Sequence, residues 1–303
     1  MTRELLIVGA GTAGVSAALW ARGHLLDVLL LESAAEPGGQ LLNVHFHPRQ
    51  LVGIPEGDGR AIAASYARQL AEAGIPVRYG ARVESLELAP DLGVRLAGDE
   101  RASARAVLVA SGVRRRLLDV PGERQFAGHG VSYSGTRDRE QFAGRAVVVV
   151  GGGDAAFENG VMLAAAGCDV TLVVRGVARA RREFVAQLAA EPRARVLEQT
   201  RVLAVLGDTR ARALRVRDAA GERELACEGV VVKVGVVPNT EWCRDSLAHD
   251  DAGYLRVDAG FATSAPGVWA AGDVVRPTLA SVPVAAGHGA LAVAAIRAAL
   301  RGA

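Results

Sequence analysis

The sequence predicts an α/β protein made of two similar units, each built on a parallel β-sheet. Two apolar runs, residues 5–8 and 146–150, lead directly into glycine-rich turns at Gly9–Gly14 and Gly151–Ala156. A helical pattern follows each turn, and an apolar run at residues 28–31 completes the first strand–helix–strand unit. Glycine in such turns lets backbone N–H groups approach a pyrophosphate at the amino end of a helix. Two dinucleotide-binding units are therefore expected.

A glutamate stands at the end of the second strand. Glu32 follows residues 28–31 at about 20 residues beyond the first turn, where an acidic side chain binds a ribose hydroxyl of the dinucleotide. A glycine turn that served packing alone would leave Glu32 unexplained. A protein that holds two dinucleotides most simply passes electrons between them, so a flavoprotein that also binds a nicotinamide cofactor is the first inference.

Length and composition allow two globular domains and limit the partners. The 303 residues are 50% hydrophobic, and the net charge of +2 gives no electrostatic footprint for nucleic acid. The first strand begins at Leu5, which leaves no room for a secretory signal peptide. The longest apolar span begins at Val282 and is interrupted by His288 and Arg297, which argues against a membrane helix. The expected location is the cytoplasm.

Cysteine and lysine usage disfavours several kinds of chemistry. Cys168, Cys227 and Cys243 are odd in number and far apart, which argues against a disulfide framework and against a CxxC redox pair or metal site. Each is expected to be a buried, inert thiol. The only lysine, Lys233, lies in the strand-like run 230–234, which disfavours Schiff-base and P-loop chemistry.

The remaining elements continue the α/β pattern. Arg114–Arg116 is expected to be a solvated crossing between domains, and residues 237–240 the return crossing. The other expected elements are a helix over 60–73, strands at 77–79, 82–88, 94–96, 106–112, 195–205, 211–218, 228–235 and 268–271, and a final helix from about Gly287 to Arg301.

The second dinucleotide unit is expected to be inserted within the first domain. The predicted domains are residues 1–116 with 242–303 for the discontinuous domain and residues 117–241 for the inserted one. Two hinge strands would then join the halves and permit rotation between them.

The motifs, taken in order, resemble those of the low-molecular-weight thioredoxin reductases, over nearly the whole chain. The resemblance implies two Rossmann-like domains of three-layer ββα architecture, with FAD in the discontinuous domain, NADPH in the inserted domain, and a homodimer. The residues that carry it are Gly9–Gly14, Pro37–Leu41, Ala110–Gly112, Gly130–Tyr133, Gly151–Ala156, Pro238–Thr240, Pro266–Asp273 and Ala285–Gly287.

The resemblance also implies which residues bind FAD. Asp273 has a second possible role as a helix-capping aspartate, and the two roles are compatible. Where the family commonly has Arg-Gln before its final helix, this chain has Ala280–Pro283, so a changed flavin potential is expected. The expected FAD-binding residues are Gly9, Gly11, Thr12, Ala13, Gly14, Glu32, Gly39, Gln40, Ala110, Gly112, Gly272, Asp273, Ser281 and Val282.

The resemblance fails at the redox centre. After Gly130–Tyr133 the family has a CxxC-Asp motif, whereas this chain has Ser134–Asp138, in which both cysteines are replaced. A serine hydroxyl cannot cycle between dithiol and disulfide, so thioredoxin reduction by the family's mechanism is excluded. Asp138 has two open roles, a catalytic acid/base or a cap of the next helix, and the cap is favoured. Arg137 is expected to pair with Asp138 or Glu140, with stabilisation of reduced flavin and attraction of an acidic partner as alternatives.

The nicotinamide side departs from the family as well. Arg175 and Arg179 match two of the family's arginines, while its histidine is Val174 here. Without an acidic residue for a free 2′-hydroxyl, NADPH is favoured over NADH, which stays possible. Loss of nicotinamide binding is the remaining alternative. The expected NAD(P)H-binding residues are Gly151, Gly153, Asp154, Ala155, Arg175 and Arg179.

The expected function is an FAD-dependent NAD(P)H oxidoreductase without a redox-active disulfide, which passes electrons from reduced flavin directly to an external acceptor. The chain is similar in this to the ferredoxin/flavodoxin–NADP reductases of the same fold, although it lacks their aromatic C-terminal extension. The acceptor is open between ferredoxin, flavodoxin, a quinone, a small disulfide and oxygen. The alternative is a flavin-binding protein that no longer uses NAD(P)H and has an interaction role or another electron donor.

Overall fold

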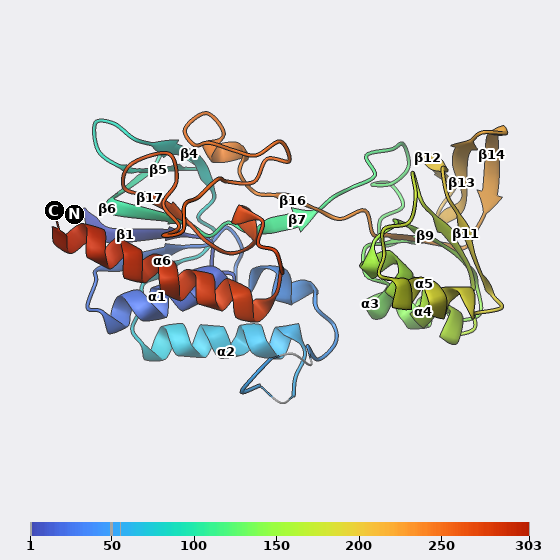
Figure 1. Cartoon of the computed structure of the whole chain (residues 1–303), viewed down its shortest axis with the longest axis horizontal. Coiled ribbons are helices and arrows are strands. Elements are labelled where there is room, and N and C mark those ends of the chain that lie inside the picture. Colours follow the sequence, from blue (N-terminus) through green and yellow to red (C-terminus); the bar gives the residue numbers. More distant parts are fainter. Residues whose placement is uncertain (1, 49–50, 55, 303) are drawn as a thin grey trace. The chain divides into compact units, whose positions relative to one another are not determined.

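The chain divides into two units in the computed structural model, which describes residues 2–48, 51–54 and 56–302 (Figure 1). Unit 1 comprises Met1–Arg114 and Val237–Ala303, and unit 2 comprises Arg115–Val236. The chain passes between them through β7 (Val113–Arg115) and β16 (Val236–Pro238), which form a two-stranded sheet. The assignment of FAD to one predicted domain and NAD(P)H to the other stays a prediction, and the predicted ends at residues 1 and 303 lie outside the described residues.

Unit 1 is built on a mainly parallel sheet with the order β3-β2-β1-β6-β5-β4, in which β17 pairs with β6. The first glycine turn connects β1 to α1, and β6 extends beyond its parallel part to pair antiparallel with β5. Its strands are β1 (Arg3–Val8), β2 (Val28–Leu31), β3 (Val77–Arg78), β4 (Val83–Glu87), β5 (Gly93–Leu96), β6 (Arg101–Val109) and β17 (Val268–Ala270).

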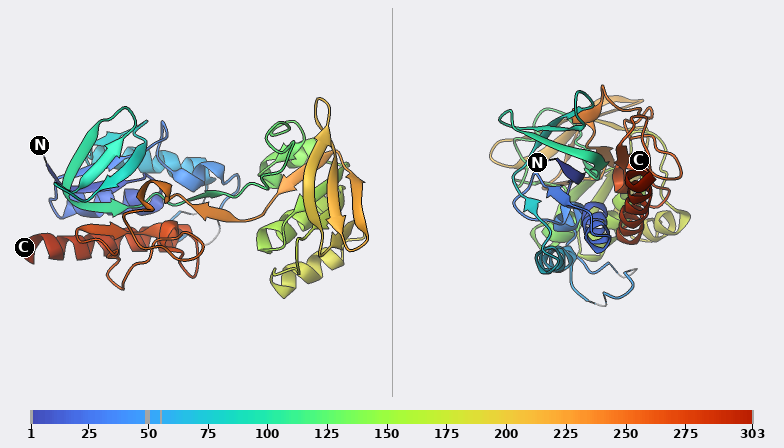
Figure 2. Two further views of the ribbon diagram at one scale, coloured as in Figure 1. Left: turned by 90° about the horizontal axis from the view of Figure 1, so that it is seen from above. Right: turned by 90° about the vertical axis from the view of Figure 1, so that its left-hand side faces the viewer.

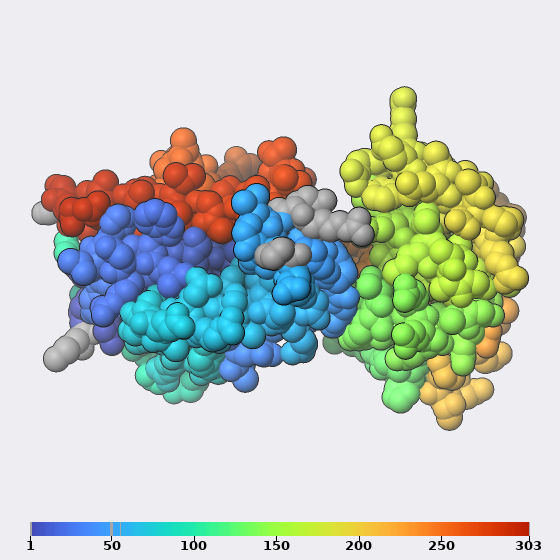
Figure 3. All heavy atoms as spheres, turned by 90° about the horizontal axis from the view of Figure 1, so that it is seen from below, coloured from blue at the N-terminus to red at the C-terminus, as the bar shows by residue number. Residues whose placement is uncertain are grey.

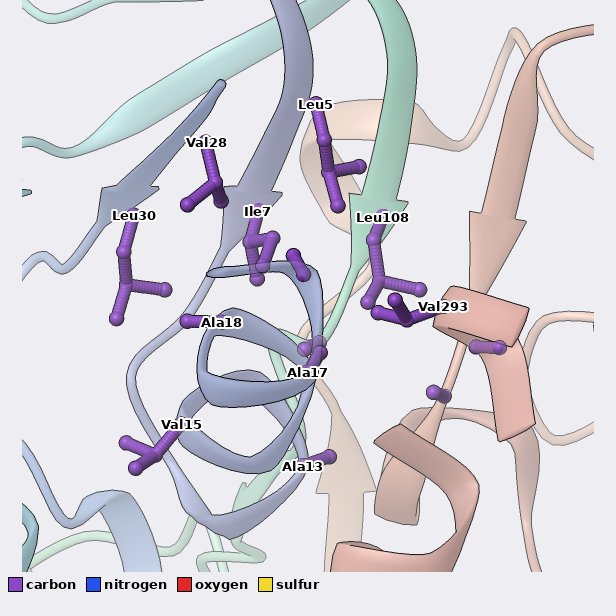
Figure 4. Packing of buried hydrophobic residues seen from close by; sticks show 14 of the residues in the cluster. Leu5, Ile7, Ala13, Val15, Ala17, Ala18, Val28, Leu30, Leu108 and Val293 are labelled. Atoms are coloured by element: carbon purple, nitrogen blue, oxygen red, sulfur yellow. The ribbon is translucent and has the colours of Figure 1, made fainter. Parts of the chain in front are cut away.

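Alternate side chains of the central strands face two different cores. Leu5 and Ile7 pack with the helices α1 (Thr12–Gly23) and α6 (Val282–Gly302), as Figure 4 shows. Leu6 and Val8 pack on the other face, with side chains of β4 and β5. The helices α1, α2 (Gly59–Glu72) and α6 cover one face of the sheet (Figures 1 and 3). The expected three-layer arrangement of sheet, sheet and helices is confirmed.

Among its described residues, unit 1 has three short 3₁₀ helices, and residues of each of them line the cavity described below. They are η1 (Gly39–Asn43), η2 (Glu241–Cys243) and η3 (Gly272–Val275).

Unit 2 repeats the three layers on a smaller sheet, with the order β11-β10-β9-β15-β8 and parallel pairing throughout. Val147 and Val149 pack against the helices, whereas Val148 and Val150 pack against the antiparallel sheet of β12, β13 and β14. Figures 1 and 2 show this antiparallel sheet and the helices of unit 2. The elements are β8 (Val131–Ser132), α3 (Gly135–Phe142), β9 (Ala146–Val150), α4 (Asp154–Ala165), β10 (Asp169–Val173), α5 (Arg182–Ala189), β11 (Ala194–Leu197), β12 (Arg201–Gly207), β13 (Ala211–Asp218), β14 (Gly221–Ala226) and β15 (Gly229–Val232).

Several predicted elements are wrong in detail. The single strand predicted at 195–205 is two strands, β11 and β12, because the chain turns between them at Gln199, which has φ +51°. The strand β14 was not expected, because its mostly exposed side chains have no apolar run. Lys233 lies just after β15 and not within it. The last helix begins at Val282 and not near Gly287.

The helix α6 has the length and mean hydropathy, 1.4, of a membrane span. Core helices of soluble proteins have the same composition. Ala292, Val293 and Ile296 of α6 are fully buried within unit 1. The expectation that the chain has no membrane helix stays a prediction.

The contact between α1 and α6 leaves no space for a side chain at one position. A Cβ atom at Gly289 would lie 2.2 Å from the Ala13 carbonyl oxygen, whereas a Cβ atom at Gly287 would have no neighbour within 4 Å. Gly289→Ala should therefore lower the free energy of unfolding by about 1–3 kcal/mol through overpacking. Gly287→Ala should raise it by roughly 0.5–1 kcal/mol, because alanine favours the helix. Urea unfolding of both variants measures the difference, and equal effects at the two positions would contradict this packing.

Candidate functional site

A cavity of about 1070 Å³ opens along the carboxyl edge of the sheet in unit 1. It has the size expected of a site for a large cofactor. Thirteen of the fourteen residues predicted to bind FAD line it, and they come from segments spread across both parts of unit 1. The thirteen are Gly9, Gly11, Thr12, Ala13, Glu32, Gly39, Gln40, Ala110, Gly112, Gly272, Asp273, Ser281 and Val282.

The fourteenth residue, Gly14, has a packing role in the first glycine turn. A Cβ atom at Gly14 would lie 1.8 Å from the Gly9 carbonyl oxygen, and one at Gly9 would lie 2.5 Å from the Ala110 carbonyl oxygen. Gly9 also has φ +106°, which favours glycine. The turn therefore presses against the end of β6, and this close approach fixes where α1 begins.

Glu32 is buried at the end of β2 and is tied to the backbone. One carboxylate oxygen accepts the Ala10 N–H at 2.7 Å, and the other accepts the Ala34 N–H at 2.8 Å. The carboxylate thus holds the glycine turn beside the strand end, within the cavity lining. The sequence placed Glu32 correctly at this edge, although its bonds to Ala10 and Ala34 were not expected.

The polar segment after β2 contributes a second wall. Gly39 approaches the first turn so closely that a Cβ atom there would lie 3.2 Å from the Gly11 Cα. The Gln40 side-chain amide donates to the Val113 carbonyl at 2.6 Å. This bond holds Gln40 against the strand that leaves unit 1.

Asp273 lies within η3, whose N-cap is Ala271, so the suggestion that Asp273 caps the helix is wrong. Burial raises the pKa of Asp273, and the nearby His288 opposes this effect. Burial also lowers the pKa of His288, and the negative charge of Asp273 opposes this effect. The pair places a partly desolvated carboxyl group in the cavity wall.

Ser281 and Val282 lie at the amino end of α6, where the Ser281 carbonyl accepts the Ala285 N–H at 3.0 Å. The early start of α6 therefore brings the first turn of a long helix to the cavity. The positive end of its dipole faces this region.

Sequence reasoning missed several residues of the cavity wall. Arg114 donates to the Pro238 carbonyl at 3.2 Å and to the Asn239 side chain at 3.0 Å, and it also forms an ion pair with Glu241. The expectation that Arg114 is only a solvated linker residue is therefore wrong. The motif Pro238–Thr240 was the one available signal. The unexpected lining residues include Gly38, Arg82, Val83, Arg114, Asn239, Glu241 and Trp242.

Ser111 and Asn239 join the two segments of unit 1 that lead to unit 2. The Ser111 hydroxyl donates to the Asn239 carbonyl at 2.7 Å, and the Asn239 amide donates to the Ser111 carbonyl at 2.8 Å. Such reciprocal bonds hold the two segments in register beside the cavity.

Unit 2 contains the second glycine turn, between β9 and α4. Gly151 has φ +150°, and a Cβ atom there would lie 2.2 Å from the Lys233 carbonyl oxygen. Asp154 begins α4 and accepts both the backbone N–H and the Nε–H of Arg181, each at 2.8 Å. These bonds from Arg181 lower the pKa of Asp154.

The arginines expected to recognise a 2′-phosphate are exposed beyond β10. Arg175 follows the strand after the buried Val174, and the Arg179 N–H donates to the Gly152 carbonyl at 2.7 Å. Arg181 was not among the residues expected to bind NAD(P)H, but its bonds to Asp154 place it next to the second glycine turn. The 2′-phosphate role of Arg175 and Arg179 stays a prediction.

Ser134–Asp138, the segment expected to correspond to the family's CxxC-Asp motif, forms the start of α3. Ser134 is the N-cap, and its hydroxyl accepts the Arg137 N–H at 3.4 Å. Asp138 lies inside the helix, so the favoured interpretation of Asp138 as the cap is wrong. Its carboxylate accepts from the Ser132 hydroxyl at 2.6 Å and from Arg137 at 2.7 and 2.8 Å. The predicted pairing of Arg137 with Asp138 is confirmed, while the catalytic role of Asp138 stays a prediction.

All three cysteines are free and buried. The Cys168 thiol donates to the Phe142 carbonyl at 3.0 Å, and the Cys243 thiol to the Thr240 carbonyl at 3.4 Å. Burial raises the pKa of Cys168, and it raises the pKa values of Cys227 and Cys243 to about 12. These thiols are protonated at neutral pH.

Comparison with known proteins identifies the family. A model of the pyridine nucleotide-disulphide oxidoreductases matches residues 3–289. The chain belongs to this family. The thioredoxin reductase of Treponema pallidum is 34% identical over 294 residues, which cover 95% of this chain and 94% of that protein. The F component of the Pseudomonas putida alkyl hydroperoxide reductase is 33% identical over 298 residues, and the match spans only 56% of its length.

The solved structures agree with the sequence comparison. The crystal structure of Lactococcus lactis thioredoxin reductase in its FR conformation superposes with a TM-score of 0.87 and 26% identity, and both chains are covered completely. This pyridine nucleotide-disulphide oxidoreductase is thus a thioredoxin reductase-like flavoprotein oxidoreductase with Rossmann-like units. Thioredoxin reductase-like members of the family depend on FAD and NADPH.

The bond from Ala10 to Glu32 generates a test of the first turn. Glu32→Ala would leave the buried Ala10 N–H without its acceptor, and an unsatisfied buried donor costs about 1–3 kcal/mol. The free energy of unfolding of the FAD-free protein in urea should fall by that amount. Glu36→Ala is the control, because Glu36 is exposed and its ion pair, with Arg60 at 3.5 Å, lies on the surface. The loss of this pair should change the free energy of unfolding by less than about 0.5 kcal/mol. Equal losses in both variants would show that the Ala10 bond is dispensable.

The raised pKa values of the thiols generate a second test. Alkylation requires the thiolate, whose population grows only as the pH rises through the pKa. Iodoacetamide at neutral pH should add nothing to the native protein in intact-mass spectrometry, and should add three groups in guanidinium chloride. A native protein that carries one or more adducts within an hour would contradict the burial of these thiols.

Proposed function

We propose that this chain is an FAD-dependent NAD(P)H oxidoreductase that passes electrons from reduced flavin directly to an external acceptor, without a redox-active disulfide. One observation carries the proposal. At the start of α3, where the family has its dithiol, Ser134 caps the helix and Arg137 pairs with Asp138. Neither side chain can be oxidised to a disulfide.

The cavity of unit 1 supports FAD as the resident cofactor. Gly9, Gly11 and Gly39 line this cavity, a Cβ atom at Gly11 would have no protein neighbour within 4 Å, and Glu32 borders the same cavity. Gly11 and Thr12 would bring the amino end of α1 to the pyrophosphate, and Val282 would bring that of α6 to the flavin ring. Bound FAD supplies two-electron exchange between a nicotinamide and an acceptor.

The second turn supports a nicotinamide dinucleotide as the electron donor. Gly151 and Gly153 keep the amino end of α4 open to a pyrophosphate, and the exposed Arg175 and Arg179 suit a 2′-phosphate because each guanidinium presents several donors. NADPH is therefore the proposed donor, with NADH as the weaker one. A homodimer and a cytoplasmic location belong to the same proposal.

A second candidate function follows from the substitutions in unit 2. Val174 is apolar and buried where the family has a histidine. Arg181, next to the turn, is already paired with Asp154. These features favour a flavin-binding protein that no longer uses NAD(P)H and that has an interaction role or a different electron donor.

Anaerobic titration of the FAD-loaded protein with NADPH or NADH separates the two functions. Bleaching of the flavin absorbance by a stoichiometric amount of NADPH is expected, because hydride transfer needs no protein sulfur. Absence of bleaching with either nucleotide would favour the second function. In steady-state assays with an artificial acceptor, the variant Cys168→Ala/Cys227→Ala/Cys243→Ala should keep kcat within about twofold of the unmodified protein. A loss of activity in a variant that retains FAD and its fold would show that a thiol relays electrons.

A further inference from the structure

The arginines expected to recognise a 2′-phosphate lie on a loop of unit 2 that is held on two sides. This arginine loop, residues 174–181, connects β10 to α5. On one side the Ala178 N–H donates to the Glu198 carboxylate at 2.7 Å, and the Gly176 carbonyl accepts the Gln199 N–H at 3.0 Å. These bonds join the loop to the segment that follows β11.

The other side of the arginine loop lies against the second glycine turn. The Arg179 N–H donates to the Gly152 carbonyl at 2.7 Å. A Cβ atom at Gly152 would lie 2.6 Å from the side chain of the buried Val174. Glycine at position 152 therefore lets the start of the loop pack directly on the backbone of the turn.

Arg181 joins the end of the loop to the first residue of α4. Its backbone N–H and its Nε–H donate to the two carboxylate oxygens of Asp154, each at 2.8 Å. Its guanidinium also lies 4.6 Å from the centre of the Phe184 ring in α5. Two bonds from one residue to both oxygens of a carboxylate fix its orientation as well as its distance. We call the pair of Arg181 and Asp154 the clamp.

The clamp also determines what Asp154 does at the amino end of α4. A carboxylate in the first turn of a helix is attracted to the N–H groups there, and it would repel a second anion. The N-cap of α4 is Gly153, which has no side chain to cap the helix. Arg181 holds the Asp154 carboxylate against the loop and balances its charge. This arrangement favours a dinucleotide pyrophosphate at the second glycine turn.

We propose that Arg181 is a positioning residue of the nicotinamide site and acts through Asp154 on Arg175 and Arg179. The clamp holds the arginine loop against the glycine turn, so that the two exposed arginines are in place before a 2′-phosphate binds. A loop that is already ordered binds more tightly, because binding no longer includes the cost of ordering it. The clamp therefore raises the preference for a 2′-phosphate over a free 2′-hydroxyl. This inference rests on the NAD(P)H-dependent function proposed above.

Direct contact between Arg181 and the phosphate is the competing role, and Asp154 distinguishes the two. If Arg181 bound the 2′-phosphate itself, removal of Asp154 would free its guanidinium and would keep or raise the preference for the phosphate. If Arg181 acts through the clamp, removal of either partner breaks the same two bonds. The two single variants should then have the same effect.

Isothermal titration of the oxidised, FAD-loaded protein with NADP⁺ and with NAD⁺ measures the preference, since the two differ only in the 2′-phosphate. Arg181→Ala and Asp154→Ala should each lower the ratio of the two affinities by about fivefold, and the double variant should lower it no further. The clamp side chains are 66% and 42% exposed, so these variants remove no core packing. Arg193→Ala is the matched control, because Arg193 forms a surface pair with Asp169, at the amino end of β10, at 3.7 Å. It should leave the ratio unchanged.

Hydrogen exchange tests the clamp without any nucleotide. The Arg179 amide is bonded to the Gly152 carbonyl, and this bond opens when the loop leaves the turn. In both clamp variants the peptide that contains residues 175–181 should exchange faster than in the unmodified protein. In Arg193→Ala it should exchange at the unmodified rate.

Three results would overturn the proposal. They are an unaltered affinity ratio in Arg181→Ala, a loss of the ratio in Arg181→Ala that Asp154→Ala does not share, and unaltered exchange of residues 175–181 in the clamp variants. The proposed function survives each of these results, because both nucleotides still bind. A protein that bound neither NADP⁺ nor NAD⁺ would instead overturn the NAD(P)H-dependent function together with this inference.

Discussion

The structure depends on one steric constraint that occurs once in each unit. The turn after the first strand must pass against the backbone just beyond the neighbouring strand. A Cβ atom at Gly9 would lie 2.5 Å from the Ala110 carbonyl, and one at Gly151 would lie 2.2 Å from the Lys233 carbonyl. Only glycine permits this approach, which sets the start of α1 and of α4 and opens the carboxyl edge of each sheet to a ligand.

The same backbone arrangement supports different chemistry in the two units because the residue opposite the glycine differs. In unit 1 this residue is Ala110, whose small side chain leaves the cavity open. In unit 2 it is Lys233, whose ammonium reaches the Tyr133 carbonyl and lies among the charges of Arg115 and Glu158. The two sheets are therefore alike in strand order and turn geometry, but they differ in the residue that lies against the glycine turn.

The features that the sequence predicted correctly depend on residues that are close together along the chain. Apolar strands that lead into glycine turns, and Glu32 at the end of β2, are local patterns, and they located most of the cavity. Arg114 and Asn239 were missed because they are 125 positions apart in sequence and meet only in the folded chain. β14 was missed because an exposed strand that is paired on one side has no apolar pattern. Asp138 was misassigned because an aspartate near a helix start resembles a cap, and the hydroxyl of Ser134, closer to the start, takes that place.

The segment Ser134–Asp138 makes a regular start to α3 and contains no thiol. Ser134 supplies the N-cap of α3, and the side chains of Ser132 and Arg137 donate hydrogen bonds to the Asp138 carboxylate. These bonds satisfy the polar groups of the first helical turn. Fixed charges cannot store electrons, and the buried thiols are protonated, with Cys168 and Cys243 bonded to backbone carbonyls. In the proposed function FAD is then the last electron carrier that the chain itself holds, and the acceptor must come to the protein.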